Sequence, residues 1–340
     1  MSVEPTPTVT IGMCSARAAL AGNPSDGYGG HVVAVPVPAV RATVRVAPTL
    51  RFEIHHSPTV DDTFDDHDHL VANVDRYGYG DARSLILATL RALRRHLDAR
   101  IAPVRLTVES SIPRSVGLAG SSAIVIATIR ALMQTEPDAD WVRPLADPAV
   151  LAALALSVEA DELGVAAGLQ DRVVQAFGEP MSMDFSNVAP VHGAALLAGR
   201  YATLAAPPGI MFVAVLDQAA GESGVTHRAL RSEHDGDGGR TRRLMAEIAE
   251  QGRAAALAIE RHDAIALGAA MDTTLDLRQS MMVLDPRLLA VSDAARGLGG
   301  HANWSGSGGA VTVLAPNDTV ATSIRASVAE LGGRIIDITD

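Results

Sequence analysis

The residues best suited to chemistry lie in one stretch, 110–130, which reads SSIPRSVGLAGSSAIVIATIR. A strand-like segment leads into a loop that contains Gly117 and Gly120, and an apolar, helix-like run follows. The adjacent serines Ser121 and Ser122 stand at the junction, and serine is a preferred helix N-cap. A glycine-rich loop that enters a helix presents free N–H groups and the positive end of the helix dipole, which suits phosphate. This stretch alone fits a phosphate-binding loop and an ordinary strand–loop–helix connection equally well.

The chain contains no lysine, and all 28 of its basic residues are arginine. A P-loop NTPase is therefore excluded, because its loop requires a lysine. Protein kinases and enzymes that form a Schiff base on lysine are excluded for the same reason. Any cationic help to a phosphate must come from arginine, a metal ion or the N-terminus of a helix.

The composition is that of a globular protein, with 48% hydrophobic and 20% charged residues among 340, enough for one large domain or two. The formal net charge of −11 disfavours nucleic acid and anionic membranes as partners. The single cysteine, Cys14, permits no internal disulfide and fits a reducing compartment. No apolar run reaches the length of a membrane span, and the first residues lack a signal-peptide pattern. We therefore expect a cytoplasmic protein.

Hydrophobic periodicity predicts the elements that must position these residues. Strands are expected at 9–13, at 31–46 as two strands or one bent strand, and at 51–56, 104–109, 181–185, 201–204, 210–216, 301–304, 310–314 and 334–338. Helices are expected at 81–98, from about residue 121, and at 148–163, 168–177, 241–261, 263–279, 286–296 and 318–331. This pattern predicts an α+β protein with two domains that meet near residues 190–205.

One acidic stretch, 61–69, reads DDTFDDHDH and combines aspartate with histidine. Both residue types can bind a metal, but their spacing matches no ligand template. A solvated acidic loop is the favoured interpretation.

Three motifs occur in order and together resemble the GHMP kinase superfamily: SARAALAGNPSDGYGG at 15–30, IPRSVGLAGSSA at 112–123 and SGSGGAVTVL at 305–314. The resemblance covers nearly the whole chain. It is greatest to the glucuronokinases, through GLQDRVVQ at 168–175, MDF at 183–185 and SGVTH at 223–227. It implies a two-domain α+β fold with the active site in the cleft. An N-terminal ribosomal-S5-like domain would span 1–195, and a C-terminal ferredoxin-like domain 196–340.

The resemblance assigns ATP and Mg²⁺ to this cleft. Mg²⁺ keeps several waters and needs few protein ligands, and the family pattern places the Ser122 hydroxyl and the Glu159 carboxylate there. The SGSGG loop at 305–309 is expected to pack beside the phosphate loop. The ATP phosphates would be held by the N–H groups of a loop one residue longer than the GLGSS of many members: Gly117, Leu118, Ala119, Gly120, Ser121, Ser122 and Ala123.

Asp171, in GLQDR, matches the catalytic aspartate of the family, and Arg17 matches the basic residue beside it. Phosphoryl transfer depends mainly on positioning and charge neutralisation. An aspartate that touches the attacking hydroxyl can accept its proton or orient it. A fixed guanidinium there would keep the carboxylate charged and stabilise the developing alkoxide.

The resemblance places the sugar near Asp26, which follows Asn-Pro-Ser, with Tyr28, Gly29 and Gly30 shaping the same pocket. Where the glucuronokinase pattern has a lysine after the two glycines, this chain has His31. A uronate carboxylate would therefore need another cation, and arginine is the better bidentate partner. The candidates are Arg278, Arg114 and Arg228.

The implied activity is an ATP-dependent sugar kinase that phosphorylates the anomeric hydroxyl of D-glucuronate to give glucuronate 1-phosphate. Two alternatives remain open. The acceptor could be galacturonate, arabinose or galactose, or the protein could be a catalytically silent sugar sensor. The presence of Asp171, Glu159, Ser122 and Arg17 favours an enzyme, because a sensor would be free to lose them. We expect a monomer or homodimer that binds a sugar or uronic acid and neither nucleic acid nor a membrane.

Overall fold

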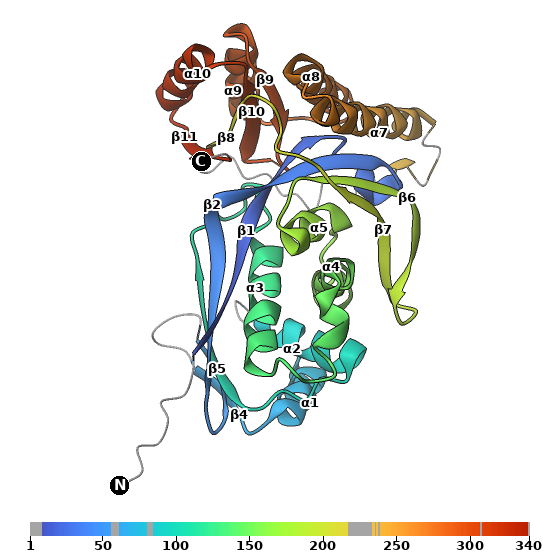
Figure 1. The fold of residues 1–340 in the computed structure, drawn as a ribbon, viewed down its shortest axis with the longest axis vertical. Helices are drawn as coiled ribbons and strands as arrows, with labels where there is room; N and C mark the ends of the chain where they lie inside the picture. Colours follow the sequence, from blue (N-terminus) through green and yellow to red (C-terminus); the bar gives the residue numbers. More distant parts are fainter. Residues whose placement is uncertain are drawn as a thin grey trace.

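Two long antiparallel strands, β1 (Thr10–Ala21) and β2 (His31–Pro48), run through the molecule. The computed structural model describes residues 9–55, 61–79, 84–216, 233–234, 236, 239–306 and 308–338. A short 3₁₀ turn, η1 (Ser25–Tyr28), lies in the connection between the two strands, which are drawn in blue in Figure 1. This ribbon carries the first of the three motifs.

β2 is the centre of a seven-stranded sheet with the order β4-β3-β5-β2-β6-β7, and β1 also pairs with β2. Its pairing with β5 covers one end of β2 and its pairing with β6 the other. Pro36 and Pro38 lie between these two segments, so their missing N–H groups interrupt neither the pairing with β5 nor the pairing with β6. Residues 31–48 therefore form one strand and not two. The remaining strands are β3 (Phe52–His55), β4 (Asp61–Phe64), β5 (Val104–Ser110), β6 (Met181–His192) and β7 (Leu196–Thr203).

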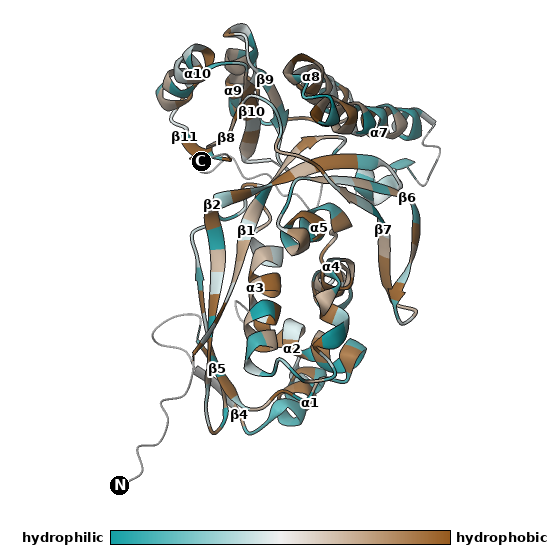
Figure 2. Cartoon of the chain, in the orientation of Figure 1, coloured by the Kyte–Doolittle hydropathy of each residue, from teal (hydrophilic) through white to brown (hydrophobic). Residues whose placement is uncertain are grey.

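Helices fill the space between the two ends of this curved sheet (Figure 1). The close approach of the central helix α3 to β1 requires Gly12, because a Cβ there would lie 2.0 Å from the carbonyl oxygen of Ala127. Figure 2 shows hydrophobic residues along the strands and hydrophilic ones on the outer helix α1. The helices are α1 (His67–Tyr77), α2 (Ser84–Leu97), α3 (Gly120–Thr135), α4 (Pro148–Ser157) and α5 (Leu169–Phe177), with a short 3₁₀ helix, η2 (Arg143–Ala146), before α4.

A four-stranded antiparallel sheet with the order β11-β8-β10-β9 forms the second half. Side chains of Asp263, Asp285 and Asn317 cap the first turns of its helices α8, α9 and α10, which explains why these helix starts could be predicted. The elements are β8 (Ile210–Val215), α7 (Gly239–Glu260), α8 (Ala264–Met281), α9 (Pro286–Gly297), β9 (His301–Trp304), β10 (Ala310–Ala315), α10 (Asp318–Glu330) and β11 (Arg334–Asp337).

The larger hydrophobic core extends across both halves, since buried residues of β1 and β2 and of helix α8 belong to the same cluster. A second, smaller core lies within the second half, between its sheet and helices α9 and α10. The mixed architecture confirms the predicted α+β class. The expected division at residue 195 is not where the sheets divide, because β7 pairs with β6 in the first sheet and β8 belongs to the second. We therefore propose the boundary between Thr203 and Ile210.

The acidic stretch 61–69 is not a loop throughout, because it forms β4 and the start of α1. His67 is buried, with Nε2 3.0 Å from the carbonyl oxygen of Leu90 and Nδ1 accepting the amide of Ile101. Within the described residues no cluster of three or more metal-ligating side chains was found. In that same part of the chain, none of the helices is both long and apolar enough to cross a membrane.

Candidate active site

A cavity of about 920 Å³ opens where the first sheet, its helices and the second half meet. It is lined by the β1–β2 connection, the loop after β5, the first turn of α3, the segment between α4 and α5, and the start of α5. Gly306, from the third motif, adds a wall from the second half. All three motifs therefore reach one cavity.

Helix α3 begins at the cavity, and its first turn is open to a ligand. The N-cap is Ala119, with left-handed backbone (φ 60°, ψ 46°) and no side-chain cap, so neither serine caps the helix as its residue type suggested. The amides of a first helical turn have no intrahelical acceptor and are available to phosphate. The loop is anchored by its carbonyls instead: those of Gly117 and Leu118 accept from Arg17, and that of Ala119 from Gln175.

The third motif packs directly against this loop, as predicted. A Cβ on Gly117 (φ 78°) would lie 2.3 Å from the carbonyl oxygen of Ser305, so only glycine fits. The Ser305 hydroxyl donates to the carbonyl of Gly117 over 3.1 Å and lies 3.2 Å from Nη1 of Arg17. The second half thus holds the loop from behind.

Arg278 does not line the cavity, where its expected role in substrate binding would place it. It is fully buried, and it donates to the carbonyl oxygens of Trp304 (2.8 Å) and Gly306 (2.7 Å). Burial and, to a smaller extent, the charge of the nearby Arg17 together lower the pKa of Arg278 to about 10. Arg278 therefore supports the third motif from behind the cavity, and its contact with substrate stays a prediction.

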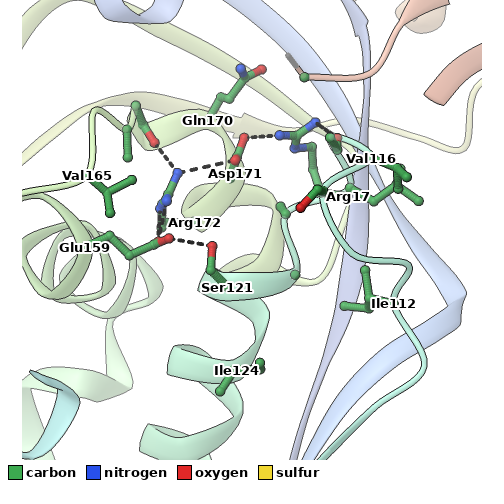
Figure 3. A pocket seen from close by; sticks show the side chains of 18 of the residues that line it. Arg17, Ile112, Val116, Ser121, Ile124, Glu159, Val165, Gln170, Asp171 and Arg172 are labelled. Atoms are coloured by element: carbon green, nitrogen blue, oxygen red, sulfur yellow. Dashed lines mark hydrogen bonds and ion pairs between the residues drawn. The ribbon is translucent and has the colours of Figure 1, made fainter. Parts of the chain in front are cut away.

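Arg17 and Asp171 form an ion pair at the cavity wall, as the family pattern implies (Figure 3). Arg17 comes from the middle of β1 and is 2% exposed, whereas Asp171 lies in the first turn of α5 and is 19% exposed. A strand thus fixes the cation, and a helix start presents the carboxylate to the cavity.

Glu159 lies on a π-helical turn, η3 (Val158–Glu162), which interrupts the helix predicted over 148–163. Such turns are frequent at functional sites. The Glu159 carboxylate is buried against Arg172, whose Nε lies 2.8 Å from Oε2, and Nη1 of Arg172 lies 3.3 Å from Asp171. Burial opposes the charge on Arg172, but Glu159 and Asp171 raise its pKa overall. Arg172 was not among the residues predicted for the site, although its position directly after Asp171 is a usable signal.

The structure does not bring together the side chains of Ser122 and Glu159, which were expected to hold Mg²⁺, and the neighbouring Ser121 contacts Glu159 instead. Oγ of Ser121 donates to Oε1 of Glu159 over 2.6 Å (Figure 3). Ser122 is fully buried, and its hydroxyl donates to the carbonyl of Ala119. Of the predicted phosphate-loop residues, Ser122 and Ala123 lie behind the cavity wall, while 117–121 line it.

Asp26 supplies the cap that helix α5 lacks in its own sequence. The N-cap of α5 is Gly168, which has no side chain, and the carboxylate of Asp26 accepts the backbone amides of Gln170 and Gly27. The fit depends on Gly168, because a Cβ there would lie 2.1 Å from Oδ2 of Asp26. Asp26, the predicted sugar-binding residue, is thus hydrogen-bonded to the helix that carries Asp171, the predicted catalytic residue.

The carboxyl of Asp26 is unusually hard to ionise. Desolvation and, to a smaller extent, the charge of Asp171 raise its pKa from 3.8 to about 6 in total. Arg17 and the two amides act in the opposite direction without cancelling it.

The other predicted sugar-site residues differ in position. Tyr28 lines the cavity, and its ring lies 4.7 Å from that of His234. Gly29 and Gly30 do not line it; a Cβ on Gly30 would lie 2.1 Å from Oγ of Ser25, so this glycine closes the turn.

The other two arginines considered as partners of a uronate carboxylate are Arg114 and Arg228. Arg114 is exposed and lines the cavity, and Arg228 lies outside the described residues. His31, which replaces the family lysine, hydrogen-bonds to Ser182 over 2.8 Å and does not line the cavity.

Known proteins resemble this chain in sequence. Residues 84–179 match the family model for the GHMP kinases N terminal domain. The chain is 32% identical over 316 residues to Glucuronokinase 1 of Arabidopsis thaliana, covering 88% of this chain and 83% of that protein.

Solved structures share the fold at low identity. The Lin0012 protein from Listeria innocua superposes with a TM-score of 0.80 at 14% identity, over 98% of each chain. The Lactococcus lactis galactokinase complexed with galactose gives 0.71 at 15% identity, over 98% of this chain and 94% of that one. The family model and the curated relative, and not the structural matches, show that the chain belongs to the GHMP kinase family.

Proposed function

We propose that this kinase transfers the γ-phosphoryl group of ATP to the anomeric hydroxyl of D-glucuronate, giving glucuronate 1-phosphate. The observation that carries the proposal is the Arg17–Asp171 pair, which faces the same cavity as the open first turn of α3. The acceptor follows from the likeness to a glucuronokinase over most of both chains.

The nucleotide would bind along the loop after β5. The amides at the start of α3 would receive the phosphates, and the helix dipole would add to their attraction. The cavity lining also includes apolar side chains, which suit a purine ring: Leu85, Val108, Ile112, Ile124 and Val165.

The side chains near the first turn of α3 fit a magnesium ion. A carboxylate oxygen of Glu159 and the hydroxyl of Ser121, 2.6 Å apart, form an all-oxygen donor set, which Mg²⁺ prefers. When bound there with ATP, the ion would neutralise charge on the phosphate oxygens. We therefore assign the hydroxyl role to Ser121 instead of Ser122.

Asp171 would accept the proton of the anomeric hydroxyl or hold that hydroxyl in line for attack. Arg17 would stabilise the negative charge that develops on the attacking oxygen. Asp26, with its carboxylate at the start of the same helix, would bind sugar hydroxyls.

The carboxylate of a uronate needs a cation at the cavity, and we propose Arg114. The other two arginines that line it, Arg17 and Arg172, are already paired with Asp171 and Glu159. Among the described residues, no ion pair of Arg114 with an acidic side chain was found. Arg114→Gln would then raise KM for glucuronate and leave KM for a neutral sugar unchanged.

Steady-state phosphorylation of a panel of sugars and uronic acids tests the function, with Asp171→Ala as the key variant. We expect kcat to fall by about 10²–10⁴ while ATP still binds, as for the loss of one acid–base group. Asp184→Ala, a control at the sheet surface, should keep its kcat. Activity on neutral sugars alone would refute the glucuronate assignment. Binding of ATP and sugar without turnover would favour the alternative that the protein is a catalytically silent sugar sensor.

A further inference from the structure

A single buried guanidinium joins the two carboxylates on which the proposed reaction depends. Arg172 is 4% exposed and donates to Oε2 of Glu159 through both Nε (2.8 Å) and Nη2. Its Nη1 donates to the carbonyl of Gly168 over 2.8 Å and lies 3.3 Å from Oδ2 of Asp171. Figure 3 shows Arg172 between the two acids.

These contacts divide the two oxygens of Glu159 between different partners. Oε2 is taken by Arg172, and Oε1 meets the Ser121 hydroxyl next to the first turn of α3. A divalent cation that binds Glu159 must therefore sit close to a fixed positive charge, and like charges repel strongly where water is excluded. Without the arginine, Glu159 would be a buried carboxylate with no counter-charge, which is costly.

We propose that Arg172 positions Glu159 and weakens the protein's own affinity for a divalent cation, so that the metal enters with the nucleotide phosphates and not alone. The proposal rests on the function proposed above. The phosphates of ATP supply the negative charge that offsets the repulsion. In the nucleotide-free protein, Arg172 takes the place of the metal as the partner of Glu159.

A second buried carboxylate on the same π-helical turn provides a matched control. Glu162 is 1% exposed and pairs with Arg91 and Arg95, and it also accepts the hydroxyl of Tyr79. Neither Glu162 nor Arg91 lines the cavity. Arg91→Gln therefore removes a cation from a buried acid of this turn without touching the site.

The test measures Mn²⁺ binding by electron paramagnetic resonance in the absence of nucleotide. Because a full positive charge beside the metal is removed, Arg172→Gln should bind Mn²⁺ about tenfold tighter than wild type, or more. Its melting temperature should be lower without metal and should rise more on adding Mn²⁺. Arg172→Lys keeps the charge and should bind Mn²⁺ like wild type. Arg91→Gln should lose stability and keep wild-type affinity for Mn²⁺.

A folded Arg172→Gln that binds Mn²⁺ no tighter than wild type would overturn the proposal, because a purely structural arginine predicts equal or weaker binding. If this variant unfolds without metal, Mn²⁺ should restore its circular dichroism and should fail to restore that of Arg91→Gln. Absence of that rescue also overturns it.

Glu159→Gln separates this inference from the proposed function. If Glu159→Gln binds Mn²⁺ with ATP as wild type does, the proposed metal site is wrong. If Glu159→Gln no longer binds Mn²⁺ and Arg172→Gln binds it no tighter than wild type, the proposed metal site is supported and only the role proposed for Arg172 is wrong.

Discussion

Replacing Asp26 by asparagine should change how stability depends on pH, in a direction set by the partly buried position of this carboxyl beside Asp171. In the folded protein its pKa is raised from 3.8 to about 6. A raised pKa means that the folded state holds its proton more tightly than the unfolded state. The folded state therefore loses stability as the pH rises through this range. Asparagine has no proton to lose, so the variant lacks this penalty.

The size of the effect follows from the shift of about two pKa units. Each unit corresponds to about 1.4 kcal/mol, so wild type should lose about 3 kcal/mol relative to Asp26→Asn between about pH 3 and pH 7. Any hydrogen bond that asparagine makes or loses adds a constant offset of about 1 kcal/mol. The pH-dependent part of the difference is therefore the quantity to measure.

Urea unfolding at several pH values gives this difference, with the two tryptophans as probes. Trp141 lies in the first half and Trp304 in the second, so coincident transitions would show that the chain unfolds as one unit. Asp184→Asn is the control, because hydrogen bonds to Ser186 and the charge of Arg200 lower the pKa of Asp184 to about 2, against the effect of burial.

The lowered pKa of Asp184 has the opposite effect, because it stabilises the folded state at neutral pH. This stabilisation is lost only as the pH falls below about 4. The Asp184→Asn difference should stay constant from about pH 5 to pH 7. For Asp26→Asn, a difference that is flat or falls with pH would show that the amides of α5 outweigh burial, contrary to the reasoning.

Three further predictions concern the corrected site. Ser121→Ala should raise the KM for Mg²⁺ about tenfold. Ser122→Ala should leave this KM unchanged and lower the free energy of unfolding by about 1 kcal/mol, because its hydrogen bond to the carbonyl of Ala119 is lost. The reverse result would restore Ser122 as the metal-site hydroxyl. Gly168→Ala should displace Asp26 and raise KM for the sugar at least about tenfold. Gly297→Ala, where a Cβ meets nothing within 4 Å, should not change it. Arg278→Met should cost about 1–3 kcal/mol in urea unfolding, because two buried carbonyls lose their donor, and a rise in KM for glucuronate without loss of stability would contradict its structural role.

Much of the fold could be predicted because local signals agree with tertiary structure. Aspartate or asparagine caps mark the starts of α8, α9 and α10. Alternating apolar residues mark the strands. The π-helical turn could not be predicted, since no residue type marks it. Its conformation depends on distant partners, such as Arg172 on Glu159 and Arg91 on Glu162.

The motifs locate the site but not the direction of every side chain. Successive residues of a helix point about 100° apart. An N-cap at Ala119 therefore turns Ser121 toward Glu159 and Ser122 into the core. The sequence also cannot show that Arg278 faces the carbonyls of Trp304 and Gly306, because its residue type fits both a ligand site and a structural support.

The long ribbon of β1 and β2 sets the smallest part of this chain that could work as a catalyst. The segment that matches the family model, 84–179, contains the phosphate loop, Glu159 and Asp171, but β1 contributes Arg17 and covers α3 through Gly12. Excised, that segment would expose the apolar side of α3 and leave Asp171 without its strand-borne cation. Engineering that swaps substrate specificity must therefore graft loops onto the whole chain, because the catalytic motifs do not form a transplantable module.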